Sequence, residues 1–109
     1  MAPLDAYRLG LACRNGDGRP RDAAAAVRWL TRAAEGGVPE AMFTLSNMLA
    51  EGEGVTPDAV AARRWLEAAA QLDYPEALQA LALRETDPRR AAELMREAGH
   101  ALGHRAKGH

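Results

Sequence analysis

The chain contains an internal repeat, in which a set of landmark residues of segment 5–40 recurs at the same spacing in segment 41–76. A fixed repeat of this length is typical of a solenoid, because each unit buries its apolar face only by stacking on the next. The repeat therefore constrains the fold more than any other feature of the sequence. The matched pairs are Leu9 and Leu45, Gly16 and Gly52, Gly18 and Gly54, Asp22 and Asp58, Trp29 and Trp65, Leu30 and Leu66, and Pro39 and Pro75.

Each unit is predicted to begin with a helix. In the first unit the apolar residues Ala6, Leu9 and Cys13 follow the spacing i, i+3, i+7, which places them on one helical face. Gly16 and Gly52 follow at matching positions in the two units. They are expected to end these helices, since glycine tolerates the conformation that a helix C-terminus often needs.

A second, alanine-rich helix is predicted in each unit, over residues 22–35 and 58–71, with an aspartate at the N-cap position. In the second unit Thr56 and Pro57 are the alternative cap and first residue of this helix. Trp29 and Leu30 are expected to lie together on the buried stripe of the first of these helices. Trp65 repeats the position of Trp29, so both tryptophans are predicted to be buried where helices meet.

A shortened third unit is predicted over residues 77–103. The glycine pair of the earlier loops is missing here, and Pro88 begins a helix directly. Leu94 and Met95 are expected to be buried in that helix. A single repeat domain, 1–109, is thus expected, with units 5–40, 41–76 and 77–103 and a tail over 104–109.

The bulk composition excludes several classes of protein. The net charge of −1 argues against nucleic acid or an anionic membrane as the partner. Cys13 is the only cysteine, so no intrachain disulfide can form, which is compatible with a reducing compartment. No secretory signal is visible and the uncharged stretches are short, so a cytoplasmic protein without a membrane span is expected.

The pattern of both units resembles the Sel-like repeat family, which is related to tetratricopeptide repeats. Three departures stand out: Cys13 and Leu49 occupy a place that the family often gives to tyrosine, Ser46 replaces a glycine, and the third unit lacks the Gly-x-Gly loop. The resemblance implies an all-α fold, an α-α solenoid with a right-handed superhelix, in a bacterial adaptor protein without catalysis. It rests on Leu9, Gly10, Gly16, Gly18, Ala26, Trp29, Leu30, Ala33 and Ala34 and their second-unit counterparts.

The sequence offers little for catalysis, and neither an enzyme nor a cofactor is predicted. Ser46 is the only serine and falls on the packing face of a predicted helix, far from any histidine in the sequence. Cys13 falls on an apolar stripe, where a free cysteine behaves as a small hydrophobe. An enzyme is therefore only a remote alternative.

All three histidines lie in the last ten residues. His100 and His104 are four apart, a spacing that places two imidazoles on one face of a helix. Gly99 and Gly103 argue against a helix here, so a tail is favoured and no metal site is predicted. Adventitious metal binding by His100, His104 and His109 is the alternative.

The partner is predicted to be another protein, bound on the concave face that the first helices line. Exposed aromatic residues on that face are typical interaction anchors, although Tyr7 and Phe43 could equally pack against the neighbouring first helix. An adaptor is favoured, and an immunity-type inhibitor of a bacterial toxin is the alternative. Weak self-association through the N-terminal end is also expected. We name the predicted partner residues the first-helix column: Tyr7, Leu11, Arg14, Phe43, Asn47, Ala50, Gln79 and Leu83.

Overall fold

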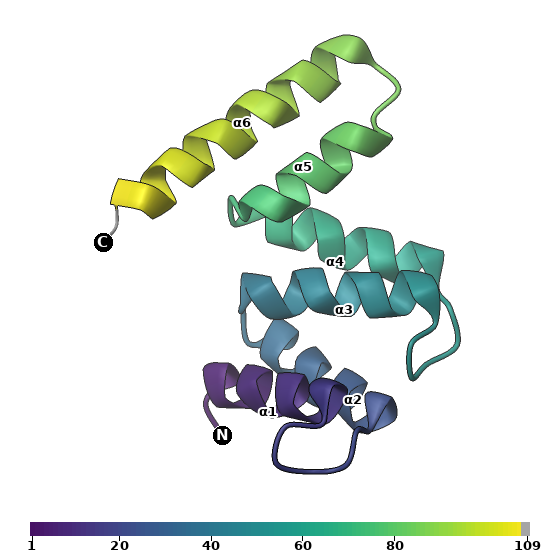
Figure 1. Ribbon diagram of the computed structural model, residues 1–109. Coiled ribbons are helices and arrows are strands. Elements are labelled where there is room, and N and C mark those ends of the chain that lie inside the picture. The colour runs from purple at the N-terminus through teal and green to yellow at the C-terminus, as the bar shows by residue number, and fades with distance from the viewer. Residues whose placement is uncertain (108–109) are drawn as a thin grey trace.

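The computed structural model describes the backbone of residues 1–107 and the side chains of residues 1–105. The described residues form six α-helices and no strand. The helices stack in successive pairs, with α1 and α2 at the bottom of Figure 1 and α5 and α6 at the top. This arrangement confirms the predicted all-α solenoid. The helices are α1 (Pro3–Asn15), α2 (Ala23–Glu35), α3 (Pro39–Glu51), α4 (Ala59–Gln71), α5 (Pro75–Arg84) and α6 (Pro88–Lys107).

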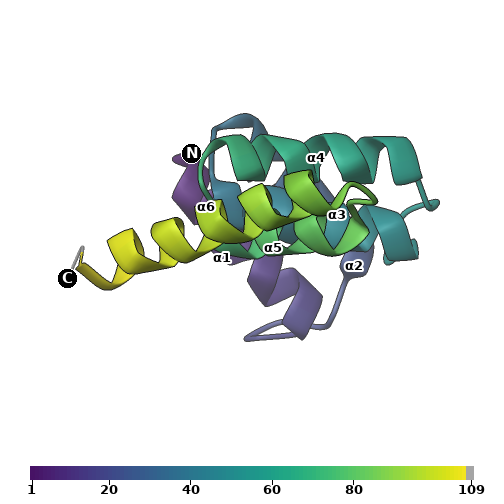
Figure 2. The ribbon, with the colours of Figure 1, turned by 90° about the horizontal axis from the view of Figure 1, so that it is seen from above.

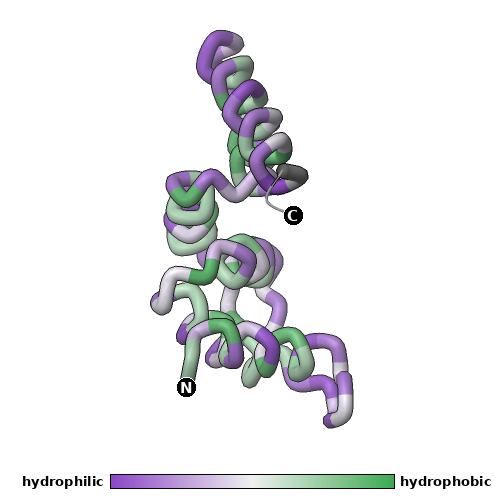
Figure 3. Tube along the Cα trace, turned by 90° about the vertical axis from the view of Figure 1, so that its left-hand side faces the viewer, coloured by the Kyte–Doolittle hydropathy of each residue, from purple (hydrophilic) through white to green (hydrophobic). Residues whose placement is uncertain are grey.

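The predicted helix ends in the first two units are confirmed. The Asp22 carboxylate accepts a hydrogen bond from the backbone N–H of Ala25 at 3.0 Å, and Asp58 caps α4 in the same way. At the other end of the first helices, the N–H groups of Gly16 and Gly52 bond to carbonyls of the last turn. Polar loops connect the helices of a pair, and Figure 3 shows the α1–α2 loop at the lower edge and the α5–α6 loop at the upper edge as largely hydrophilic.

The core is built from the inner faces of all three pairs. Leu30 and Leu66 are fully buried, whereas Trp29 and Trp65 are only half-buried, so the expectation of buried tryptophans was wrong. Consecutive residues on a helix differ by about 100° in direction, and only one of the two can face the core. Leu30 and Leu66 are the residues that face the core. The Trp29 ring lies toward the surface, where the guanidinium of Arg32 sits 5.4 Å from its centroid.

The loop of the second unit rests directly on the first unit. A Cβ added at Gly54 would lie 2.5 Å from the carbonyl carbon of Ala23, at the start of α2. Gly18 holds the matching place in the first unit and has nearly the same backbone angle, φ +72 against φ +73, but nothing lies within 4 Å of its Cβ position. Among the described residues, only the loop that carries Gly54 therefore rests on the backbone of another unit.

We expect Gly54→Ala to destabilise the protein far more than Gly18→Ala. Both substitutions place alanine at a positive φ, at a cost of about 1 kcal/mol. Only Gly54→Ala must also push the α3–α4 loop away from the backbone at Ala23, which adds on the order of 2 kcal/mol to the loss of stability. Urea unfolding of the two variants measures the difference, and equal losses would show that the contact between loop and helix does not support the array.

The last helix differs from the prediction. Helix α6 is 20 residues long against 13 for α2 and α4, and it runs through Gly99 and Gly103 to Lys107. The tail expected from residue 104 is therefore helical as far as residue 107, and His109 lies outside the described residues. Each glycine costs roughly 0.5–1 kcal/mol in a helix, a penalty that tertiary contacts of the helix can offset. In Figure 2 the C-terminal part of α6 projects beyond the stack of the other helices.

The two ends of the array present different surfaces. In α6, Leu94 is 4% exposed but Met95 is 49% exposed, so the expected burial of Met95 was wrong. No later unit covers this side of α6 among the described residues. At the other end, α1 carries the ion pair of Asp5 and Arg8 at 3.6 Å on its surface. This charged pair does not favour self-association through the N-terminal end, which stays a prediction.

Candidate functional site

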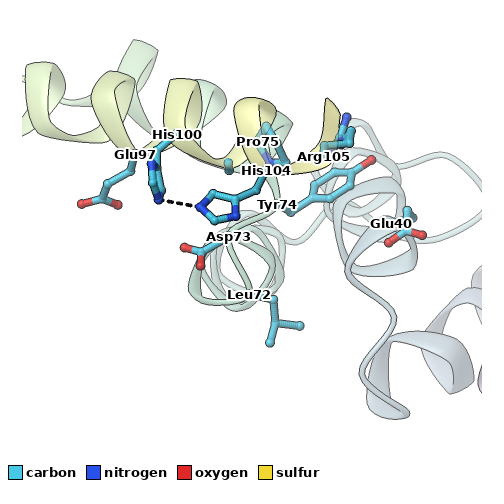
Figure 4. Close-up of a pocket in the computed structure, with 10 residues that line it drawn as sticks. Glu40, Leu72, Asp73, Tyr74, Pro75, Glu97, His100, His104 and Arg105 are labelled. Atoms are coloured by element: carbon cyan, nitrogen blue, oxygen red, sulfur yellow. Dashed lines mark hydrogen bonds between the residues drawn. The ribbon is translucent and has the colours of Figure 1, made fainter. Parts of the chain in front are cut away.

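A pocket of about 720 Å³ lies between the C-terminal half of α6 and the turn that joins α4 to α5. Figure 4 shows that the lining residues come from three elements: His100 and His104 extend from α6 toward the turn, and Glu40 lies at the far side. Its wall is mixed, with an aromatic ring, a proline, carboxylates and imidazoles. The lining residues are Glu40, Leu72, Asp73, Tyr74, Pro75, Glu97, His100, Ala101, His104 and Arg105.

The last turn of α6 is fastened to the start of α5 by Arg105. Its guanidinium donates two hydrogen bonds to the Glu76 carboxylate, at 2.8 Å and 3.0 Å, and lies 5.4 Å from the centroid of the Tyr74 ring. These bonds lower the pKa of the Glu76 carboxyl group, so the pair stays ionised at neutral pH. The contact holds α6 over the α4–α5 turn and thereby forms one wall of the pocket.

An aromatic group connects this pocket with the first-helix column. The rings of Phe43 and Tyr74 lie 5.6 Å apart at 52°, and both side chains are half-buried. Burial, together with the charge of Glu76, raises the pKa of Tyr74 to about 12, so its hydroxyl stays a hydrogen-bond donor. Burial also raises the pKa of Tyr7, with the charge of Glu40 as the second cause. Tyr7 and the pocket thus share the neighbourhood of Glu40.

The other predicted partner residues are spread along the array. Leu11, Asn47 and Gln79 are half-buried, while Ala50 and Leu83 are exposed. Leu83 is 86% exposed, which makes it the most exposed of the large apolar side chains described. Apolar surface is therefore exposed on α5, which is the first helix of the third unit, as well as at Phe43 on α3.

Arg14 lies apart from the pocket and is engaged within the protein. Its guanidinium donates two hydrogen bonds to the Glu53 carboxylate, each at 3.0 Å, and thereby joins the end of α1 to the α3–α4 loop. The pair is partly buried, with the two side chains 33% and 19% exposed. Arg21 approaches the same carboxylate at 3.8 Å. Arg14 is thus placed to connect the first two units.

Glu53→Gln should destabilise the protein by about 1 kcal/mol at neutral pH, because a partly buried bidentate pair loses its charge. The Arg14 guanidinium lowers the pKa of the Glu53 carboxyl. The stabilisation is therefore complete above the ordinary glutamate pKa of about 4.3 and disappears as the pH falls through the lowered value. Urea melts of both proteins should converge once the pH lies below the lowered pKa of Glu53.

Glu35→Gln is the matched control for this pH dependence, because Glu35 is exposed on the last turn of α2. Its loss should leave the free energy of unfolding nearly unchanged. If Glu53→Gln unfolds at the same urea concentration as the parent at neutral pH, the ion pair does not hold the units together.

The two candidate nucleophiles occupy structural positions. Ser46 is buried and its hydroxyl donates a hydrogen bond to the backbone carbonyl of Phe43 at 2.9 Å. Cys13 is buried in the core, where the nearest polar partner of its sulfur is Arg19 at 3.8 Å. Neither group faces the pocket.

None of the residues that line the pocket was predicted as a partner residue, and this includes Glu40, Tyr74 and Arg105. The repeat signal marks positions that are alike in successive units, and Tyr74 and Arg105 have no counterpart of the same kind. Glu40 and Glu76 occupy matching positions of the repeat, and this match is the one feature of the sequence that pointed toward the pocket. The histidines were considered only as metal ligands in a tail.

The repeated helix pairs define the chain as a solenoid of helix-turn-helix units. A family model described as Sel1 repeat matches residues 3–38, 39–74 and 79–101. The chain therefore belongs to the Sel1 repeat family, whose repeats generally serve as protein–protein interaction modules. No curated protein matches the chain. Within the described residues, no helix is long and apolar enough to cross a membrane.

Two solved structures are similar to this fold. The crystal structure of a Sel1 repeat protein from Oxalobacter formigenes superimposes with a TM-score of 0.86 at 25% identity, covering 91% of this chain and 43% of that one. The crystal structure of c5321, a protective antigen of uropathogenic Escherichia coli strains with an SLR fold, gives a TM-score of 0.83 at 31% identity, covering 90% and 22%. The chain thus spans less than half the length of either relative.

Proposed function

We propose that this Sel1 repeat domain binds a partner polypeptide without catalysis, through the first-helix column and the adjoining pocket under α6. The observation that carries the proposal is the continuity of the two features. Phe43 belongs to the column and touches Tyr74, which lines the pocket. Half-buried aromatic rings beside polar groups are the usual composition of an interaction hot spot.

The chemistry of the pocket favours a partner segment with a basic or hydrogen-bond-donating side chain. Glu40, Asp73 and Glu97 all line it. Among the described lining residues, Arg105 is the only arginine, and its charge is balanced by Glu76. Arg90 pairs with Glu97 at 3.5 Å, so Glu40 and Asp73 supply most of the unbalanced negative charge. An acidic wall beside an aromatic ring attracts a cationic side chain by both Coulomb and cation–π interaction.

An inhibitor of a bacterial toxin is the second candidate function. The same carboxylates and Tyr74 would suit a basic active site on a toxin, because complementary charge accelerates association. The protein encoded by the neighbouring gene distinguishes the two candidates. Inhibition of that protein's activity by the purified domain supports the inhibitor, whereas binding without inhibition supports the adaptor.

Phe43→Ala should weaken the complex with the partner by about 2 kcal/mol or more, which is roughly thirtyfold in Kd. The aromatic ring is half-buried, so truncation removes both contact area and the support of Tyr74. The partner is first isolated by affinity purification on the parent domain, and the variants are then titrated by calorimetry.

Arg64→Ala is the control for this titration, because Arg64 is exposed on α4 and away from the first helices. It should leave the affinity nearly unchanged. Both variants must keep the helical circular dichroism of the parent. Normal binding by Phe43→Ala together with weak binding by Arg64→Ala would place the interface on the second helices instead.

A further inference from the structure

We propose that His100 and His104 form a binding site for a divalent transition-metal ion of the zinc class, at the edge of the pocket under α6. The helix that the glycines argue against does form, and it places the two imidazoles one turn apart on one face. Their Nε2 atoms point at each other at 2.9 Å, as the dashed line in Figure 4 shows. Both side chains are exposed, so a hydrated ion can reach them.

The distance between these nitrogens is close to what a tetrahedral ion requires. Zinc–imidazole bonds are about 2.0–2.1 Å, so two nitrogens at a tetrahedral angle lie about 3.3 Å apart. The pair therefore needs to open by only about 0.4 Å, a small side-chain rotation. In the metal-free pair one Nε2 donates a proton to the other. To bind the ion, that donor ring would take the tautomer with its proton on Nδ1, so that both rings offer an Nε2 lone pair and each keeps one proton on Nδ1.

The surroundings favour a cation but supply few further ligands. Asp73 and Glu97 line the same pocket, and the neighbouring charge of Arg105 is neutralised by Glu76. Glu97 also pairs with Arg90 at 3.5 Å, so Asp73 is the main source of negative charge beside the imidazoles. No group of three or more His, Cys, Asp or Glu side chains in the described residues is arranged to hold a metal ion. Two imidazoles would thus be the protein ligands, and water or a donor from a bound partner would complete the coordination. Imidazole ligands select zinc, nickel or copper over magnesium.

Calorimetric titration of the metal-free domain with Zn²⁺ tests the site without any partner, so its result is independent of the proposed function. We expect one ion to bind per chain, and His100→Gln and His104→Gln each to weaken binding at least tenfold. Glutamine keeps the helix propensity of the position, which circular dichroism verifies. His109→Gln is the matched control and should change the affinity less than twofold. Mg²⁺ should not bind at the same concentrations.

Three results would overturn the proposal. The first is unchanged Zn²⁺ affinity in His100→Gln or His104→Gln, and the second is loss of binding in His109→Gln. The third is equal binding of Mg²⁺ and Zn²⁺, which would mean that the carboxylates of the pocket hold the ion rather than the imidazoles.

Discussion

The structure depends on one constraint: a helix pair of this length cannot bury its own apolar face, so consecutive units must approach closely. Small residues permit that approach. Gly54 lets the loop of the second unit touch the backbone at Ala23, and fully buried alanines such as Ala33 and Ala41 line the junction between the first two pairs. The partly buried pair of Arg14 and Glu53 spans the same two units. These contacts fix how the first two units stack, and the stacking in turn sets which residues of these units reach the surface.

Within the described residues, the third unit lacks the glycine contact and the ion pair that join the first two units, and its packing differs accordingly. Helices α5 and α6 follow each other without a Gly-x-Gly loop, and α4 contacts α5 less extensively than α2 contacts α3. Helix α6 is instead held at its far end, where Arg105 reaches Glu76 across 29 residues of sequence. Leu94 and Ala98 pack the inner face of α6 into the core, and the pocket lies between the C-terminal half of this helix and the α4–α5 turn. The candidate site is therefore a product of irregularity at the end of an otherwise regular array.

The difference between the two regular units and the irregular third unit also explains what the sequence could predict. The repeat predicted the helix pairs, their aspartate caps and their glycine ends, because each signal is local and occurs twice. It did not determine which of two adjacent residues faces inward, so Trp29 was expected in the core that Leu30 fills. It also could not predict the length of α6. Local propensity disfavours a helix through Gly99 and Gly103, and the contact of Arg105 with Glu76 that fastens the helix joins distant parts of the sequence.

The position of the pocket also bears on how such a domain could gain a specific partner. In the first two units the first-helix positions hold Tyr7 and Phe43, which give a general aromatic surface. The terminal helix adds groups that no other unit contains: two facing imidazoles and an arginine held against Tyr74. Rigidly placed polar groups at the end of an apolar surface contribute selectivity more than affinity, because a wrong partner leaves them unpaired. We therefore expect α6 to determine which partner is bound, and the first helices to supply most of the binding affinity.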